Sequence, residues 1–147
     1  MELTYINIED ISSRGIDVLI HTAFYNQEPD IRITSSGKKE YIIKKVRNNY
    51  LSLKARQSQL SEEEAPLPYY ASNNRDAIQL CEKHSVNWSL NYVSKSSLYL
   101  ASVENINYVY KTASGALIRA VLIHQLKKKF GDSIKLTYKV LDKYIEL

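Results

Sequence analysis

Residues 38–56 combine basic and tyrosine side chains in a pattern that suits contact with phosphates. The stretch contains seven basic residues and one acid, Glu40, and Tyr41 and Tyr50 lie among them. Cations beside aromatic rings can pair with phosphates and stack on bases, so one hypothesis is a nucleic-acid-binding surface. The alternative is a solvated edge hairpin, whose lysines prevent edge-to-edge pairing of strands. The basic residues are Lys38, Lys39, Lys44, Lys45, Arg47, Lys54 and Arg56.

A second candidate site would bind a small phosphorylated ligand. Arg119 lies within the apolar stretch 116–123 of the sequence. An arginine in such a stretch needs a carboxylate, a phosphate or solvent, because burying it unpaired is costly. A ligand anion is one interpretation, and a structural partner or a solvent-facing helix edge is the other. The predicted ligand-binding residues are Tyr69, Tyr70, Arg75, Trp88 and Arg119.

Catalytic and metal-binding patterns are weak in this sequence. Cys81 and His84 are three residues apart on a predicted helix, so a thiolate and a histidine base could be neighbours. Cys81 lies on the apolar face, however, where a cysteine usually serves as a small hydrophobe. His21, His84 and His124 are scattered, and there is no second cysteine for a zinc set. No GxGxxG, Walker or GxSxG pattern occurs. We therefore predict a non-enzymatic protein without metal or cofactor.

The composition is typical of a globular protein of single-domain size. A chain of 147 residues, 44% of them hydrophobic, can bury a core without disulfides. Its one cysteine fits a reducing compartment. The N-terminus lacks a signal-peptide pattern, and the longest apolar run is too short to span a bilayer. We therefore expect a cytoplasmic protein that does not enter membranes.

Net charge and tyrosine content leave the partner open. The net charge of +4 attracts phosphates through its long-range field, but it is also ordinary surface charge. The 12 tyrosines suit half-buried strand positions and binding surfaces alike. Exposed strand edges together with these tyrosines predict a homo-oligomer.

Hydrophobic periodicity and capping residues predict three helices and six strands. The first helix covers 8–25, the second follows Ser72 or Asn73, and the third runs from Ser114 or Thr112 to Phe130 and stops at Gly131. Alternation predicts strands at 30–35, 39–46, 86–92, 98–102, 106–110 and 134–140. In the strand 86–92, we expect Val86, Trp88, Leu90 and Tyr92 to form a buried face.

These elements predict an α+β fold. Helices and strands do not alternate strictly, which favours a mixed, mainly antiparallel sheet of about five or six strands packed with about three helices. We expect a single domain. Its parts are an N-terminal helix and basic hairpin (1–65), a helix–strands–helix unit (66–131) and a C-terminal strand (132–147).

The central half of the chain resembles a family of small phage-encoded proteins. The resemblance is carried by "PYYASNNRDAIQLCEKH", by the following strand that contains Trp88, and by "YKTASGALIRAVLIHQL". It implies an α-β-α sandwich and a phage or prophage accessory protein that acts against a host system, with no assigned reaction. The matching positions are Tyr70, Ser72, Ala77, Arg119 and Ala120.

Two functional expectations follow. The first is a non-enzymatic accessory protein that sequesters a small phosphorylated ligand or blocks a host protein. A small ligand predicts a pocket, whereas a protein partner predicts an exposed patch. The alternative is a nucleic-acid-binding module that uses the basic hairpin, with an affinity that falls steeply with salt.

Overall fold

The computed structural model describes residues 4–44, 64–140 and 143–146. It confirms the α+β class, with three α-helices and three three-stranded sheets in this part of the chain. The helices are α1 (Ser13–Tyr25), α3 (Asn74–Lys83) and α4 (Ala113–Phe130), and the 3-10 helices are η1 (Ile8–Asp10) and η2 (Gly131–Ser133). The strands are β1 (Thr4–Asn7), β2 (Asp30–Ile33), β3 (Lys39–Lys44), β4 (Glu64–Pro66), β5 (Trp88–Val93), β6 (Leu98–Val103), β7 (Ile106–Tyr110), β8 (Ile134–Val140) and β9 (Lys143–Glu146).

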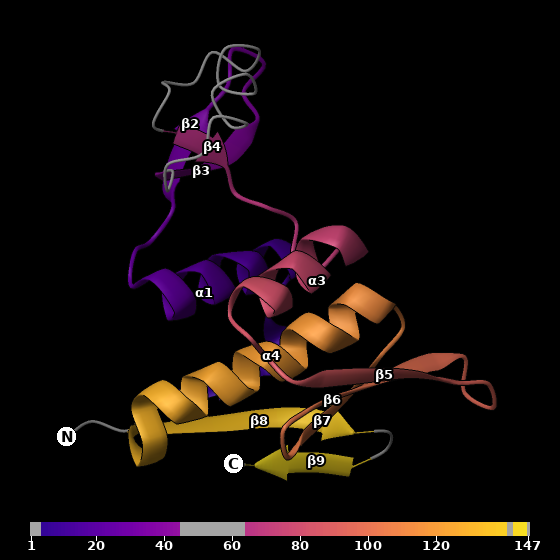
Figure 1. Cartoon of the computed structure of the whole chain (residues 1–147). Coiled ribbons are helices and arrows are strands. Elements are labelled where there is room, and N and C mark those ends of the chain that lie inside the picture. Colours follow the sequence, from indigo (N-terminus) through magenta and orange to yellow (C-terminus); the bar gives the residue numbers. More distant parts are fainter. Residues whose placement is uncertain (1–3, 45–63, 141–142, 147) are drawn as a thin grey trace.

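The predicted single sheet is replaced by three separate sheets, ordered β1-β8-β9, β2-β3-β4 and β5-β6-β7. The β2–β4 sheet stands apart from the others, on the far side of α1 and α3 (Figure 1). The remaining two sheets lie on the side of α4 that faces away from α1 and α3 (Figure 1). Because α1, α3 and α4 lie between the hairpin and the other strands, the hairpin cannot extend their ladders.

Helix α4 is the centre of the core. It packs against α1 and α3 on one side and against β6 and β7 on the other, so most of its residues between Ser114 and Leu126 are buried. A helix that is apolar nearly all round is typical of such an internal position. Thr112 caps its start by accepting a hydrogen bond from the Gly115 N–H. Its end is stabilised by Lys127, whose Nζ donates to the carbonyls of Gly131 and Ile134.

Helix α1 begins later than predicted. The sequence indicated a helix from Ile8, but η1 ends at Asp10 and Ser12 caps α1 by accepting from the Gly15 N–H. The serine cap supplies a partner for an otherwise free backbone donor, which makes position 12 a better start than position 8. The helix ends at Tyr25, and the capping residue Asn26 takes a left-handed conformation (φ 54°).

The predicted hairpin and meander are confirmed. β2 pairs antiparallel with β3, and Gly37 supplies the positive φ (82°) of the connecting turn. β5, β6 and β7 form an antiparallel meander. The short strand β4 adds to β3 and was not predicted, because three residues ending in Pro66 carry no alternating pattern.

The expected buried face of the strand at 86–92 is wrong at its aromatic positions. Trp88 is 37% exposed and Tyr92 57% exposed, whereas Leu90 is half-buried. Trp88 lies opposite the buried Val103, so its side of the sheet is the one that faces the core. β5 is an edge strand, however, and α4 covers chiefly β6 and β7.

The C-terminal strand is confirmed as β8, but its partner could not be predicted. β8 pairs in parallel with β1, with Thr4 opposite Ile134, and antiparallel with β9. In the described ranges, no helix is long and apolar enough to cross a membrane.

Candidate functional site

A cleft of about 670 Å³ lies beside β3, between the β2–β3 turn and the chain that leaves β4. Its walls combine three cationic side chains with two tyrosines, and Glu40 is the carboxylate of the lining. The lining residues are Arg14, Lys38, Lys39, Glu40, Tyr41, Ile42, Pro66 and Tyr69. The arrangement places cations and aromatic rings around one concave surface, which is the combination that the basic stretch 38–56 indicated.

The β2–β3 turn positions the two lysines. Thr34 closes this turn, because its N–H donates to the Lys38 carbonyl (2.8 Å) and its hydroxyl accepts from the Lys38 N–H (3.1 Å). Both lysine side chains are exposed, and no carboxylate in the described residues pairs with either ammonium group. These two charges are therefore available to an anion.

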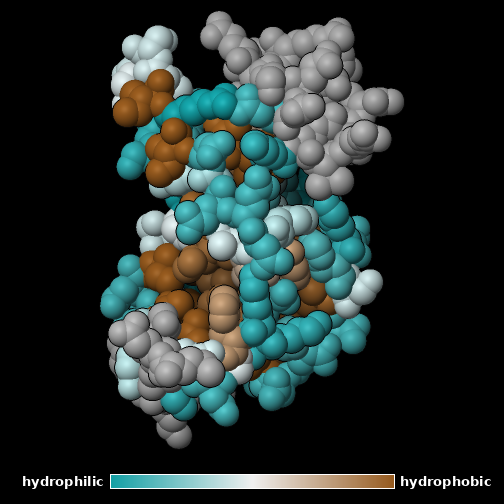
Figure 2. Space-filling model, turned by 90° about the vertical axis from the view of Figure 1, so that its left-hand side faces the viewer, coloured by the Kyte–Doolittle hydropathy of each residue, from teal (hydrophilic) through white to brown (hydrophobic). Residues whose placement is uncertain are grey.

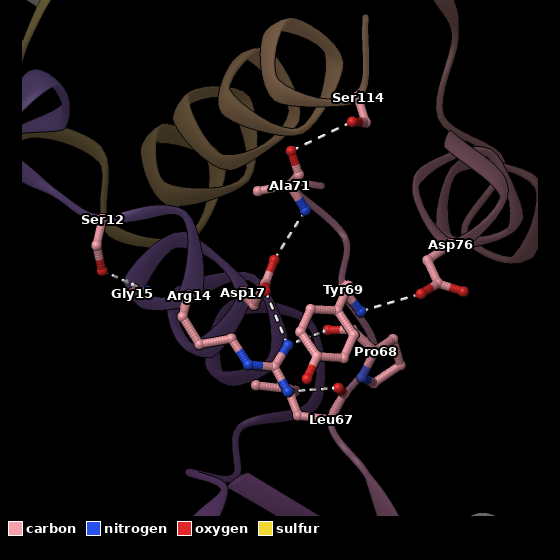
Figure 3. Close-up of polar contacts among 10 residues, drawn as sticks. All are labelled: Ser12, Arg14, Gly15, Asp17, Leu67, Pro68, Tyr69, Ala71, Asp76 and Ser114. Atoms are coloured by element: carbon pink, nitrogen blue, oxygen red, sulfur yellow. Dashed lines mark hydrogen bonds and ion pairs between the residues drawn. The ribbon is translucent and has the colours of Figure 1, made fainter. Parts of the chain in front are cut away.

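Arg14 on α1 has partners within the protein. Its Nη1 donates to Asp17 and to the Pro68 carbonyl (both 2.8 Å), and its Nη2 donates to the Leu67 carbonyl (2.7 Å). Its guanidinium also lies 3.9 Å from the centre of the Tyr69 ring. Figure 3 shows the guanidinium held among these groups. Arg14 therefore positions the lining of the cleft and is not a free anion-binding group.

Asp17 connects α1 to the same part of the chain. Its side chain is fully buried, and its two oxygens accept from Arg14 Nη1 and from the Ala71 N–H, each at 2.8 Å. Burial raises the pKa of this carboxyl above its usual value, and the two hydrogen bonds oppose that shift. The ion pair is thus partly shielded from water and well hydrogen-bonded.

Residues 67–71 are fixed by all three α-helices. Beside the contacts from Arg14 and Asp17 on α1, the Tyr69 N–H donates to Asp76 on α3 (2.9 Å), and Ser114 on α4 donates to the Ala71 carbonyl (3.2 Å) (Figure 3). The Leu67 N–H in turn donates to the Tyr41 carbonyl on β3 (2.9 Å). Tyr69 is therefore held on a rigid backbone at the edge of the cleft.

The structure places the predicted ligand-binding residues in different surroundings. Tyr69 lines the cleft, and its neighbour Tyr70 is buried, with its pKa raised by that burial. Arg75 is exposed on α3, and Trp88 begins β5. Tyr69 and Tyr70 are joined by their peptide bond. In the part of the chain described, no hydrogen bond, ion pair or ring contact joins any other two of the five predicted ligand-binding residues.

Arg119 has internal partners. It is 3% exposed, its Nη1 donates to the Gly115 carbonyl (3.2 Å), and its guanidinium lies 3.8 Å from the centre of the Tyr110 ring. A cation over an aromatic face is attracted by the ring's quadrupole. These contacts favour the structural-partner interpretation of Arg119.

The residues of the nucleic-acid alternative are only partly described. Lys38 and Lys39 line the cleft, and Lys44 is exposed at the end of β3. Lys45, Arg47, Lys54 and Arg56 lie outside the described residues.

The side chains of Cys81 and His84 are not hydrogen-bonded to each other in the described structure. Cys81 is fully buried, and burial raises the pKa of its thiol to about 11, which disfavours the nucleophilic thiolate. His84 instead shares a hydrogen bond with the Tyr25 hydroxyl (3.1 Å). Across the described ranges, no group of three or more His, Cys, Asp or Glu residues could hold a metal ion.

His21 should make the protein sensitive to acid. It is 3% exposed, neither ring nitrogen has a hydrogen-bond partner in the described structure, and its pKa is lowered from 6.5, mainly by burial and secondarily by Lys83. A lowered folded-state pKa means that the unfolded chain binds the proton first, so the free energy of unfolding falls as pH drops below about 6.5.

The His21→Phe variant should lose part of this acid dependence while keeping the ring contact with Tyr25. Urea unfolding between pH 7 and pH 5 measures it. Some dependence should remain, because burial also lowers the pKa of His84. An unchanged slope of stability against pH would contradict the role given to His21.

Sequence reasoning identified the two lysines and Tyr69 but missed Arg14 and Asp17, which hold the backbone of residues 67–71. Arg14 and Asp17 stand three residues apart on the predicted first helix, a spacing that allows an ion pair. Nothing local indicated that both would contact residues 67–71, more than 50 residues away.

Comparison with known proteins gave no match among protein-family models, curated proteins or solved structures. The class of this protein is therefore described from its own fold and candidate site. It is an α+β protein with a cleft of cationic and aromatic side chains beside a small, separate sheet.

Proposed function

We propose that this is a non-enzymatic binding protein that holds a small phosphorylated ligand in the cleft beside β3. The observation that carries the proposal is the placement of Lys38 and Lys39, two exposed ammonium groups without a described counter-charge, in a concave site with Tyr41 and Tyr69. The volume of about 670 Å³ lies within the range of ordinary small-molecule sites.

The chemistry of the lining supports binding rather than reaction. The described lining residues include no cysteine, serine, threonine or histidine, so a thiol or aliphatic hydroxyl nucleophile and an imidazole base are missing from it. Lysines act here as compact charges that pair with phosphate oxygens. Sequestration is therefore the simplest action of such a site.

The resemblance to phage-encoded accessory proteins suggests where such sequestration would matter. A ligand withheld in the cytoplasm of a host cell would no longer reach the host system that uses it. The proposal itself rests on the cleft. A host protein as the target would not require these two lysines to line a concave site.

A double charge reversal tests the site. Lys38→Glu/Lys39→Glu should weaken the binding of inorganic pyrophosphate at least about tenfold, because attraction at two partly exposed positions becomes repulsion. Isothermal titration calorimetry at low ionic strength measures the affinity. Lys95→Glu/Lys111→Glu is the matched control, since both lysines are exposed, lie outside the cleft and give the same change in net charge.

Equal pyrophosphate affinity in the two double variants, or no binding to the natural protein, would overturn the proposal. Preferential binding of a short single-stranded oligonucleotide would favour the nucleic-acid alternative instead. In that case the affinity should fall steeply with salt, and removing the charges of Lys44, Lys45 and Arg47 should flatten this dependence.

A further inference from the structure

We infer that the ligand of this cleft is a nucleotide whose base stacks on Tyr69 while its phosphates pair with Lys38 and Lys39. The inference rests on the proposed function and specifies its ligand class. Such a ligand would contact both the lysine ammonium groups and the tyrosine ring, which come from different parts of the chain.

Tyr69 is exposed and held in place, as a stacking residue needs to be. It is 55% exposed although it lines a concave site, so much of the ring is open to a ligand. The Arg14 guanidinium lies 3.9 Å from the centre of the ring and supports it (Figure 3). The backbone of Tyr69 is held by the hydrogen bond to Asp76. A ring fixed in this way loses little conformational freedom when a base stacks on it.

The distribution of charge assigns the phosphates to the lysines. Arg14 is also in the lining, but three of its hydrogen bonds go to Asp17 and to the carbonyls of Leu67 and Pro68. Binding a phosphate through Arg14 would break those contacts. Lys38 and Lys39 have no such partners among the described residues, so an anion gains their interaction without loss of an internal one.

The two groups come from separate segments of the lining. The lysines belong to the β2–β3 turn and the start of β3, whereas Tyr69 belongs to residues 67–71, and Tyr41 and Pro66 complete the lining. A sugar phosphate or inorganic phosphate would use only the lysines. An uncharged aromatic molecule would use only the tyrosine. A nucleotide carries a flat aromatic group and an anionic group within one small molecule, so it uses both.

The test compares nucleotides with pyrophosphate on the same protein. Calorimetry should show that adenosine 5′-diphosphate or uridine 5′-diphosphate binds about tenfold more tightly than inorganic pyrophosphate, because base–aromatic stacking adds to the phosphate contacts. Tyr69→Leu should reduce the nucleotide affinity to about that of pyrophosphate and weaken pyrophosphate binding much less. Tyr69→Phe should retain the nucleotide preference, because it keeps the ring.

Tyr92→Leu provides the matched control, since Tyr92 is exposed to a similar degree but lies on β5. It should change neither affinity. Thermal unfolding of each variant establishes that it is folded before titration. Lysine-dependent pyrophosphate binding with no gain for either nucleotide, or a nucleotide preference that survives Tyr69→Leu, would overturn this inference alone. Absence of lysine-dependent binding for every probe would overturn the proposed function as well.

Discussion

Asp17→Ala should lower the free energy of unfolding by about 3 kcal/mol. The variant removes a fully buried carboxylate and leaves the Ala71 N–H without its acceptor and Arg14 without its anion. Removing one member of a buried ion pair is costly because the remaining polar groups stay desolvated. Arg14 is 24% exposed and can recover some hydration. The expected loss of unfolding free energy is therefore near the lower end of the range for breaking a buried ion pair. Urea unfolding at pH 7 measures the effect.

Asp17→Asn is the control for this prediction. The amide keeps the shape of the side chain and an oxygen that can accept from Ala71, but it loses the charge opposite Arg14. We expect a loss of about 1–2 kcal/mol, smaller than for alanine. Equal stability of Asp17→Ala and the natural protein would show that residues 67–71 do not depend on this link.

The same variant should affect the cleft. Asp17 and Arg14 together fix the backbone that carries Tyr69, so a looser attachment raises the cost of ordering the site on binding. Asp17→Ala should therefore weaken nucleotide binding more than pyrophosphate binding, because only the nucleotide uses Tyr69. Equal weakening for both probes would argue for a general loss of structure.

Gly115→Ala should destabilise the protein by about 2 kcal/mol, although alanine is the better helix former by about 1 kcal/mol. A Cβ at position 115 would approach Tyr110 and Thr112 to less than 3.0 Å. Arg119 lies over the Tyr110 ring, and Thr112 is the helix cap, so neither neighbour can move without losing an interaction. Denaturant unfolding decides the sign, and a stabilised variant would contradict the steric argument.

A double-mutant cycle with Tyr110→Ala identifies the source of this effect. In the Tyr110→Ala background, the most crowded contact is absent, and Gly115→Ala should cost clearly less than in the natural protein. Identical costs in the two backgrounds would place the strain at Thr112 instead.

The small sheet shows that the hydrophobic pattern located its strands but did not determine their exposure. Ile31 and Ile33 alternate as in a half-buried strand, yet they are 56% and 74% exposed. Figure 2 shows hydrophobic residues at the surface of the upper part of the molecule, where this sheet lies. Alternation of hydrophobic and polar residues indicates a strand, but it does not determine whether other elements of the protein cover that strand.

Local signals in the sequence were sufficient for most of the elements. Asn73 and Thr112 were each one of two candidate caps, Gly131 was recognisable as a helix stop and Gly37 as a turn residue, because each supplies a hydrogen bond or a backbone conformation that depends on neighbouring residues. The meander could be predicted for the same reason, since its strands follow one another with short turns.

Tertiary structure decided the sheets, the state of Arg119 and the site. The parallel pairing of β1 with β8 joins residues about 130 positions apart, and β4 is too short to carry a pattern. Burial of Arg119 against Tyr110, and the link from Asp17 to Ala71, depend on which helices pack together. The sequence by itself determined the helices, the hairpin, the meander and the basic character of residues 38–56. Only the packing of α1, α3 and α4 around residues 67–71 brought Tyr69 to the same cleft as Lys38 and Lys39, because contacts across such separations leave no local periodicity to read.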